Sequence, residues 1–423
     1  MGDPISGVMR ILAGAKRDRF VRALEQRGAS DLAEVEPAVR RIVSNVRRNG
    51  DRALRRYAAR WDGLGSGEPV RVPEADLHDA WERTAPDLRE AITQAAGNIR
   101  RYCEWQKPQE WRREIHPGVC VGQLVRPLES VGTYVPGGRY PLPSTLLMTV
   151  IPAQVAGVPQ IRVASPHPAQ ATLAAAGFLG VREFYRVGGA QAIAALAYGT
   201  ESIPGVNKIV GPGNRYVTAA KKMVAFDCDI EFLAGPTEAV FISEQGDPTF
   251  IACDLVAQAE HDPDALCVLI TTSLGLAKSV RTEVRRSTKT NPVAAESLSR
   301  RGAILLVESL DRAVEAANRI APEHLTLPAA LAPAVKNAGS IFLNEFTPQS
   351  AGDYTSGPNH VLPTGAMARV RGGLSVLDYV RIISCQEVSG EGIRRIAPAA
   401  IALAEAEGLW GHAESLRVRC SHA

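Results

Sequence analysis

Gln258 and His261 are three positions apart at the end of a predicted helix, so their side chains lie on one face. Gln258 also continues the apolar stripe of Ile251 and Leu255, where a buried amide needs a partner, either a backbone group or a metal ion. The alternative for this pair is a simple cap at the helix end. Metal binding and capping therefore both stay open on the spacing alone.

Asp353 and His360 belong to the segment SAGDYTSGPNH, which has too much glycine, serine and asparagine for a core element. Loops of this kind lie at the surface and often carry function. A carboxylate, an imidazole and an amide oxygen together suit zinc, although manganese or cobalt would also be accepted. The pattern matches neither H-E-x-x-H nor a cysteine-based zinc finger, so a catalytic metal is favoured over a structural one.

Glu323 and His324 are adjacent and follow Pro322 at the end of a predicted helix. Adjacent side chains point in different directions, so the two could act on two atoms of one substrate. The imidazole would then be a general base, and the carboxylate would activate water. A solvated helix end is the alternative. His412, five residues after Glu407, would on its own be interpreted as a surface histidine.

Three loops rich in glycine and proline follow predicted strands, and each could bring backbone N–H groups close to a phosphate. They are Tyr134 to Gly138, Gly188 to Gln191, and Gly211 to Arg215. Helices begin after the second and third loops, and the free N–H groups of a helix N-terminus favour an anion. Each loop alone could simply turn the chain, but three at one sheet edge indicate a ligand. The G-x-G-x-x-G fingerprint follows none of the predicted strands.

Short β-branched runs alternate with helix-length segments from about residue 130, which predicts parallel sheets covered by helices. A first series has strands at 160–164, 183–187 and 208–210, with helices at 144–155, 169–179 and 190–198. A second series has strands at 239–243, 266–271, 303–307 and 340–343, with helices at 248–260, 274–286 and 311–320. The expected fold class is α/β, with two Rossmann-like, doubly wound parallel-sheet domains and small terminal appendage domains.

The expected division of the chain has four parts. Residues 1–24 form a helical appendage, and 25–128 with 238–375 form the α/β domain that carries the metal and catalytic loops. Residues 129–237 form the second Rossmann-like domain with the glycine-rich loops, and 376–423 form a tail that either packs on its own core or reaches a partner subunit.

Composition excludes several classes of protein. The 423 residues are 45% hydrophobic and 22% charged, which excludes collagen-like, disordered and coiled-coil proteins. A net charge of +3 argues against a nucleic-acid partner, and the early arginines are interpreted as the outward faces of two amphipathic helices that meet at Asn49 and Gly50.

Seven cysteines without a C-x-x-C pair favour a reducing compartment, the cytoplasm. We expect neither a secretory signal nor a membrane span, because prolines and polar residues interrupt the most apolar window, 142–158.

Together these motifs resemble histidinol dehydrogenase, a zinc- and NAD-dependent family that completes histidine biosynthesis. The resemblance runs from about residue 10 to the C-terminus and rests on VGTYVPGG, GGAQAIAALAYGT, VNKIVGPGNRYV, LAGPTE, AQAEHDPD, APEHL, SAGDYTSGPNHVLPTG and EGLWGHAESLRVR. It implies a four-electron oxidation of L-histidinol to L-histidine through an enzyme-held aldehyde, with two NAD molecules used in succession.

The resemblance also implies a role for each matched residue. The zinc ligands would be Gln258, His261, Asp353 and His412. The catalytic pair would be Glu323 and His324, and the NAD contacts would be Tyr134, Gln191 and Asn214. Besides the zinc ligands, the substrate would contact Thr237, His324, His360 and Glu407. His412 and Glu407 would come from the other subunit of a domain-swapped homodimer.

Thr237 departs from the family pattern, because these dehydrogenases usually carry Ser at this point of the LAGPTE motif. The hydroxyl is kept, but the added methyl group narrows the pocket. An alternative substrate is therefore another small polar alcohol, such as a sulfonated diol, oxidised by an enzyme of the same fold. Glu407, expected at the imidazole end of histidinol, is present and favours histidinol. A catalytically silent zinc- or nucleotide-binding dimer is disfavoured, because every catalytic position is filled.

Overall fold

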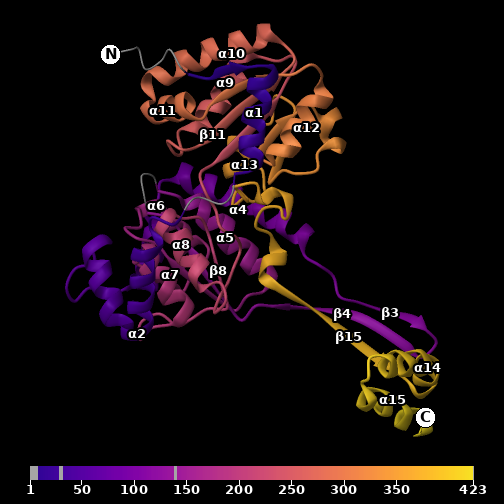
Figure 1. Cartoon of the computed structure of the whole chain (residues 1–423). Coiled ribbons are helices and arrows are strands. Elements are labelled where there is room, and N and C mark those ends of the chain that lie inside the picture. Colours follow the sequence, from indigo (N-terminus) through magenta and orange to yellow (C-terminus); the bar gives the residue numbers. More distant parts are fainter. Residues whose placement is uncertain (1–7, 28–31, 138–140, 423) are drawn as a thin grey trace.

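The computed structural model describes residues 8–27, 32–137 and 141–422, and over these residues it is a mixed α/β protein built on parallel sheets (Figure 1). Gly138, the last residue of the first predicted loop, lies outside the described residues. None of the helices in the described ranges is both long and apolar enough to cross a membrane.

The first sheet is built mainly from residues 130–230. Its strand order is β2 (Arg71–Val72), β7 (Glu183–Tyr185), β6 (Gln160–Ala164), β5 (Ser130–Tyr134), β8 (Lys208–Val210) and β9 (Asp229–Ile230). All neighbours are parallel except β2 and β7. The connections run outward from β5 to β7 and then return to β8 on the other side of β5. The switch point between β5 and β8 is where α/β sheets of this kind bind ligands, outside the carboxyl ends of the strands.

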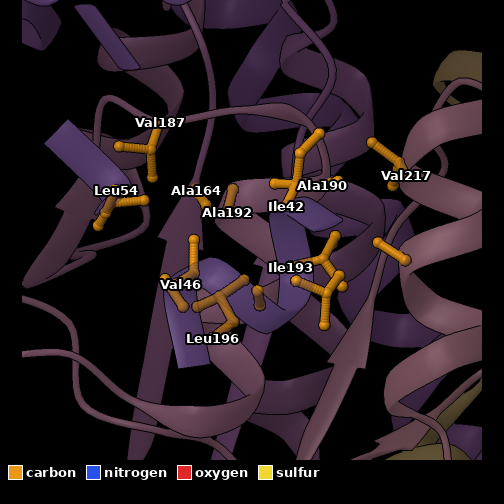
Figure 2. Close-up of a cluster of buried hydrophobic side chains, with 14 of the residues drawn as sticks. Ile42, Val46, Leu54, Ala164, Val187, Ala190, Ala192, Ile193, Leu196 and Val217 are labelled. Carbon is orange, nitrogen blue, oxygen red and sulfur yellow. The ribbon is translucent and has the colours of Figure 1, made fainter. Parts of the chain in front are cut away.

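Helices from two parts of the chain cover this sheet. Those between its strands are α5 (Pro143–Ala156), α6 (Gln170–Phe178), α7 (Gly189–Tyr198) and α8 (Arg215–Val224). Those that precede the sheet are α2 (Glu36–Trp61), α3 (Glu74–Glu82) and α4 (Pro86–Gln106). Figure 2 shows Ile42, Val46 and Leu54 of α2 in one buried cluster with Ile193 and Leu196 of α7, with Val46 beside Leu196 and Leu54 beside Val187. Long stretches of the N-terminal region therefore belong to the core of the first sheet.

A break within α2 divides it into two helical parts. Gly50 has φ 49° and ψ −134°, a conformation outside the helical region that glycine adopts without a Cβ penalty. The predicted end signal at Asn49 and Gly50 is therefore confirmed. Most of the arginines between Arg40 and Arg60 are exposed, as the amphipathic pattern predicts.

The second sheet repeats the strand order of the first. It runs β1 (Arg10–Leu12), β12 (Ala303–Leu306), β11 (Leu266–Thr271), β10 (Glu238–Ile242), β13 (His324–Leu327) and β14 (Ser340–Leu343), and every pair is parallel. Its helices are α1 (Gly14–Glu25), α9 (Pro248–Ala259), α10 (Leu274–Ser287), α11 (Pro292–Arg300), α12 (Leu310–Ile320) and α13 (Gln349–Tyr354). All residues of β10 and β11 are buried, because a parallel sheet is covered on both faces.

The C-terminal tail extends away from the two sheets (Figure 1). Its base is an antiparallel sheet of β15 (Val380–Val388), β4 (Val119–Pro127) and β3 (Trp111–His116). Two helices follow, α14 (Gly390–Ala406) and α15 (Trp410–His422), and they pack on each other. Four short 3-10 helices complete the described elements: Thr288–Thr290, Ala329–Ala334, Met367–Arg369 and Val376–Tyr379.

The strand pairing differs from the expected division of the chain. β1, from the segment expected to form an appendage, is an edge strand of the second sheet. β2 and α2, expected to belong with residues 238–375, join the first sheet and its core instead. The predicted strands and helices of both series are present to within about two residues. A strand of two or three residues carries too little alternation to be predicted, so its sheet partner could not be assigned from sequence.

Candidate active site

Glu323 and His324 lie where α12 gives way to β13. The helix ends at Ile320, and Ala321 adopts a left-handed conformation that turns the chain into the strand. Glu323 is 7% exposed and His324 is 3% exposed. The alternative of a solvated helix end is therefore wrong, because the dipeptide opens a buried strand beside β10.

His324 is placed between two carboxylates. Its Nδ1 lies 3.6 Å from Glu323 Oε2, and its Nε2 lies 3.5 Å from Asp353 Oδ1. Neither ring nitrogen has a hydrogen-bond partner among the described residues, although both are fully buried. Glu323 is held from behind, since its Oε2 accepts a hydrogen bond from the backbone N–H of Glu238 at 2.9 Å. A buried imidazole with unpartnered nitrogens needs a ligand or a proton acceptor beside it.

The charges in this cluster shift one another's protonation. Burial raises the pKa of Glu323, and the neighbouring His324 offsets part of that rise. Burial alone would lower the pKa of His324, but the carboxylates of Glu323 and Asp353 raise it to about 10. Burial would raise the pKa of Asp353, but the contact with His324 outweighs it and the pKa falls. His324 therefore holds a proton between two carboxylates, and a cation beside Asp353 would compete with that proton.

Two of the four expected zinc ligands, Gln258 and Asp353, are in contact, and the exposed His261 lies near them. Gln258, in the last turn of α9, is 2% exposed and its Nε2 donates to Asp353 Oδ2 at 3.1 Å. His261, two residues beyond α9, is close enough to contribute to the lowered pKa of Asp353. His360 Nδ1 lies 2.7 Å from the backbone oxygen of Asp353, on the wall of a cavity of about 210 Å³ that His324 also lines.

His412 and Glu407 are not part of this cluster. Both are exposed residues of the tail, which points away from the sheets (Figure 1). Within the described residues no group of three or more His, Cys, Asp or Glu side chains is assembled for a metal ion. The residues that do converge offer an amide oxygen, an imidazole and a carboxylate, a donor set that fits zinc with positions left open. One chain therefore supplies ligands that suit zinc, but not a complete set of them.

A larger cavity of about 550 Å³ lies at the carboxyl end of the first sheet. It is lined by Tyr134, Gln191 and Asn214, one from each of the three loops predicted to bind a ligand. The Tyr134 hydroxyl accepts a hydrogen bond from Gly189 N at 3.1 Å, and Asn214 Oδ1 caps α8. The structure thus brings together the three residues that were expected to contact NAD.

Asp62 is a residue of this cavity that the sequence analysis missed. It follows the last residue of α2, is 8% exposed, and its Oδ2 accepts hydrogen bonds from Gly188 N and Gln191 Nε2, each at 3.0 Å. Burial raises the pKa of its carboxyl group. Trp61 and Tyr216 also line the cavity. No local motif marks Asp62, because its partners lie more than 120 residues away in the chain.

The two cavities lie at opposite ends of the strands in their respective sheets. Glu323, His324 and Gln258 lie at the amino ends of the strands in the second sheet, whereas the larger cavity lies at the carboxyl ends in the first sheet. The loop around His360 contacts α5, a helix of the first sheet: His360 Nε2 lies 3.3 Å from Thr145 Oγ1 at the start of α5, and Asn359 donates to the backbone oxygen of Met148.

Comparison with known proteins identifies the family. The family model described as histidinol dehydrogenase matches residues 25–420. This chain belongs to the histidinol dehydrogenase family. A curated histidinol dehydrogenase from Methanothermobacter thermautotrophicus is 46% identical over 415 residues, covering 95% of this chain and 97% of the relative. One from Aquifex aeolicus is 46% identical over 413 residues, covering 96% and 97%.

A solved structure supports the same conclusion. Histidinol dehydrogenase from Elizabethkingia anophelis superposes with a TM-score of 0.92 at 33% identity, covering 98% of each chain. An acetylating aldehyde dehydrogenase from Geobacillus thermoglucosidasius, at 13% identity and a TM-score of 0.50, shares the fold alone. The chain is accordingly an oxidoreductase of the histidinol dehydrogenase family, and the alternative of another small alcohol is not favoured.

Proposed function

We propose that this enzyme oxidises L-histidinol to L-histidine in two steps through a bound aldehyde, with NAD as the electron acceptor in both. The observation that carries the proposal is the buried dipeptide of Glu323 and His324: His324 lies between Glu323 and Asp353 and lines a cavity of about 210 Å³. An acid–base pair beside a carboxylate that can bind a cation suits the oxidation of an amino alcohol.

We propose that zinc is held by Gln258, His261 and Asp353 of one subunit with His412 of a second subunit. Zinc is not redox-active and would supply positioning and polarisation of the substrate. The tail supports a second subunit as the source of His412, because it projects from the body with exposed apolar side chains such as Trp410, which is 64% exposed. A homodimer would cover those side chains and bring Glu407 to the substrate together with His412.

The chain's own residues would move the protons. The negative charge of Asp353 helps to keep His324 protonated, and a cation beside Asp353 would offset that charge. The pKa of His324 would then fall, and the neutral imidazole could accept the proton of the substrate hydroxyl. Glu323, whose pKa is raised by burial, would accept a proton from the water that attacks the aldehyde. Thr237 and His360 would form walls around the substrate. A buried site would retain the aldehyde between the two steps.

The cavity of the first sheet is the proposed NAD site, with contacts from Tyr134, Gln191 and Asn214. NAD supplies the hydride acceptor in both steps. The cavity lies beside the topological switch point, and the contact between His360 and Thr145 joins this half of the molecule to the catalytic dipeptide. We also propose that the enzyme works in the cytoplasm, because all seven cysteines are free.

Glu323→Gln and His324→Asn test the division of labour. We expect Glu323→Gln to slow oxidation of the aldehyde by about 100-fold or more while alcohol oxidation is less affected, and His324→Asn to slow alcohol oxidation by a similar factor. Each variant would be assayed for NADH formation with histidinol and, separately, with histidinal. His78→Asn, at an exposed histidine of α3, is the control. Full activity of both site variants would exclude the dipeptide as the catalytic pair.

A further inference from the structure

A largely buried ion pair, Arg27 with Glu238, lies next to the catalytic dipeptide. Glu238 opens β10, the strand that pairs with β13, and its backbone N–H is the donor that holds Glu323. The Glu238 carboxylate is bound by Arg27, with Nε to Oε1 at 2.7 Å and Nη2 to Oε2 at 2.6 Å. Two parallel hydrogen bonds of this kind fix both the position and the orientation of a carboxylate.

Arg27 also binds the turn that leads into Glu323. Its Nη1 donates to the carbonyl oxygen of Ile320 at 2.7 Å and to that of Leu24 at 2.5 Å. Ile320 is the last residue of α12, where a carbonyl has no partner within the helix. One guanidinium therefore joins the end of α1, the end of α12 and the start of β10.

The turn needs this support because its backbone is strained. Ala321 has φ 50° and ψ 63°, a left-handed conformation that a Cβ atom disfavours, and the following Pro322 restricts it further. Such residues persist only where the surroundings determine their conformation. Glu238 is itself fixed from a second side, since Gly365 N donates to its Oε1 at 3.0 Å.

We propose that Arg27 and Glu238 are positioning residues that hold Glu323 in place for the chemical step. The assignment rests on the proposed function of Glu323 in activating water. Neither residue lines the substrate cavity, so their effect on the reaction passes through the turn and through the backbone N–H of Glu238. Arg27, which follows α1 and is distant in sequence from the site, would thereby affect the rate of the reaction.

The test uses Arg27→Met, Glu238→Gln and the double variant, with thermal unfolding, kcat, KM and NAD binding measured for each. Either single variant leaves one buried partner of the pair without its counterpart, so both the unfolding temperature and kcat should fall. The double variant removes both charges, so its unfolding temperature should recover. Its kcat should stay about 10- to 100-fold below that of the unchanged enzyme, because a misplacement of about 1 Å costs a factor of this size.

Arg27→Lys keeps the charge without the paired geometry, so it should restore the unfolding temperature more fully than kcat. KM for histidinol and the Kd for NAD should change by less than about threefold in all these variants, because the pair acts on the chemical step. Arg319→Met is the matched control: Arg319 lies in the last turn of α12, but its side chain pairs with Glu25 and its loss should leave kcat unchanged. Recovery of kcat together with stability in the double variant would overturn the proposal and leave a purely structural pair.

A crystal structure of the double variant separates this proposal from the proposed function. We expect the distance from Glu323 Oε2 to Glu238 N, 2.9 Å here, to lengthen beyond hydrogen-bonding range. An unmoved Glu323 would overturn the positioning role whatever the substrate is. Failure of the proposed function would instead show in the unchanged enzyme, which would form no NADH from histidinol.

Discussion

Replacing Asp62 by alanine should weaken both the fold of the first sheet and its affinity for NAD. The carboxylate accepts two hydrogen bonds, from Gly188 N and Gln191 Nε2, and both donors lose this charged partner in Asp62→Ala. A hydrogen bond to a charged group contributes roughly 1.5 to 3 kcal/mol. The cost of burying the carboxylate, which also raises its pKa, offsets part of the stabilisation from the two hydrogen bonds. The expected loss is about 2 to 4 kcal/mol of unfolding free energy.

The effect on NAD follows from the position of Gln191. Without Asp62 the Gln191 side chain has no fixed orientation in the cavity, so we expect NAD to bind about tenfold more weakly or worse, which corresponds to roughly 1.4 kcal/mol. Asp62→Asn should cost less, because the Gln191 amide can turn over and still pair with it.

Urea unfolding and calorimetric titration with NAD measure the two effects. The matched control is Asp227→Ala, which removes an exposed carboxylate that binds Tyr198 and Arg47 in the same half of the molecule. An exposed pair contributes at most about 1 kcal/mol, and NAD affinity should not change. If Asp62→Ala matched the control in both measurements, the assignment of the cavity and of Gln191 would be refuted.

Three further predictions address other parts of the account. Gly211→Ala would place a Cβ atom 2.1 Å from the backbone oxygen of Tyr134 at a φ of +109°, so it should lower NAD affinity measurably by calorimetry and cost about 1 to 3 kcal/mol of stability in urea unfolding. Burial raises the pKa of Asp254 to about 6, so the charged form is penalised in the folded protein above that pH. Asp254→Asn should therefore raise the unfolding temperature at pH 8, and the gain should vanish as the pH falls through 6 towards 4; an equal gain at both pH values would contradict it. Mixing His412→Ala with Glu323→Gln protein should restore part of the activity if His412 comes from a second subunit, and no recovery in demonstrated mixed dimers would place it in its own subunit's site.

The sequence predicted the regular parts of the fold well, because strands such as 266–271 and helices such as 248–260 follow clear periodicities and are bounded by turn residues. It could not show which sheet each early segment joins. β1 and β2 have only two or three residues each, and their pairing is decided by packing far along the chain.

The site also has residues that could be predicted from the sequence and residues that could not. The loops around Asp353 and Asn214 are marked by glycine and proline, so their residues could be chosen from the sequence. The sequence placed Glu323 and His324 at a helix end, because β13 begins at His324, only four residues after α12. A strand this short has too little alternation to be predicted. Asp62 contacts Gln191, and Arg27 contacts Glu238. Both partners are distant in the sequence, so the local spacing of residues could not predict these contacts.

The central claim is that the cluster around Glu323, His324 and Asp353 carries out a zinc-assisted, NAD-dependent oxidation of histidinol. The most direct test is to incubate the purified enzyme with L-histidinol and NAD, with and without a chelator, and to count the NADH formed for each histidinol consumed. The account predicts two NADH for each histidinol, loss of activity with the chelator, and recovery when zinc is added. Absence of NADH with histidinol, or formation that the chelator does not affect, would contradict it.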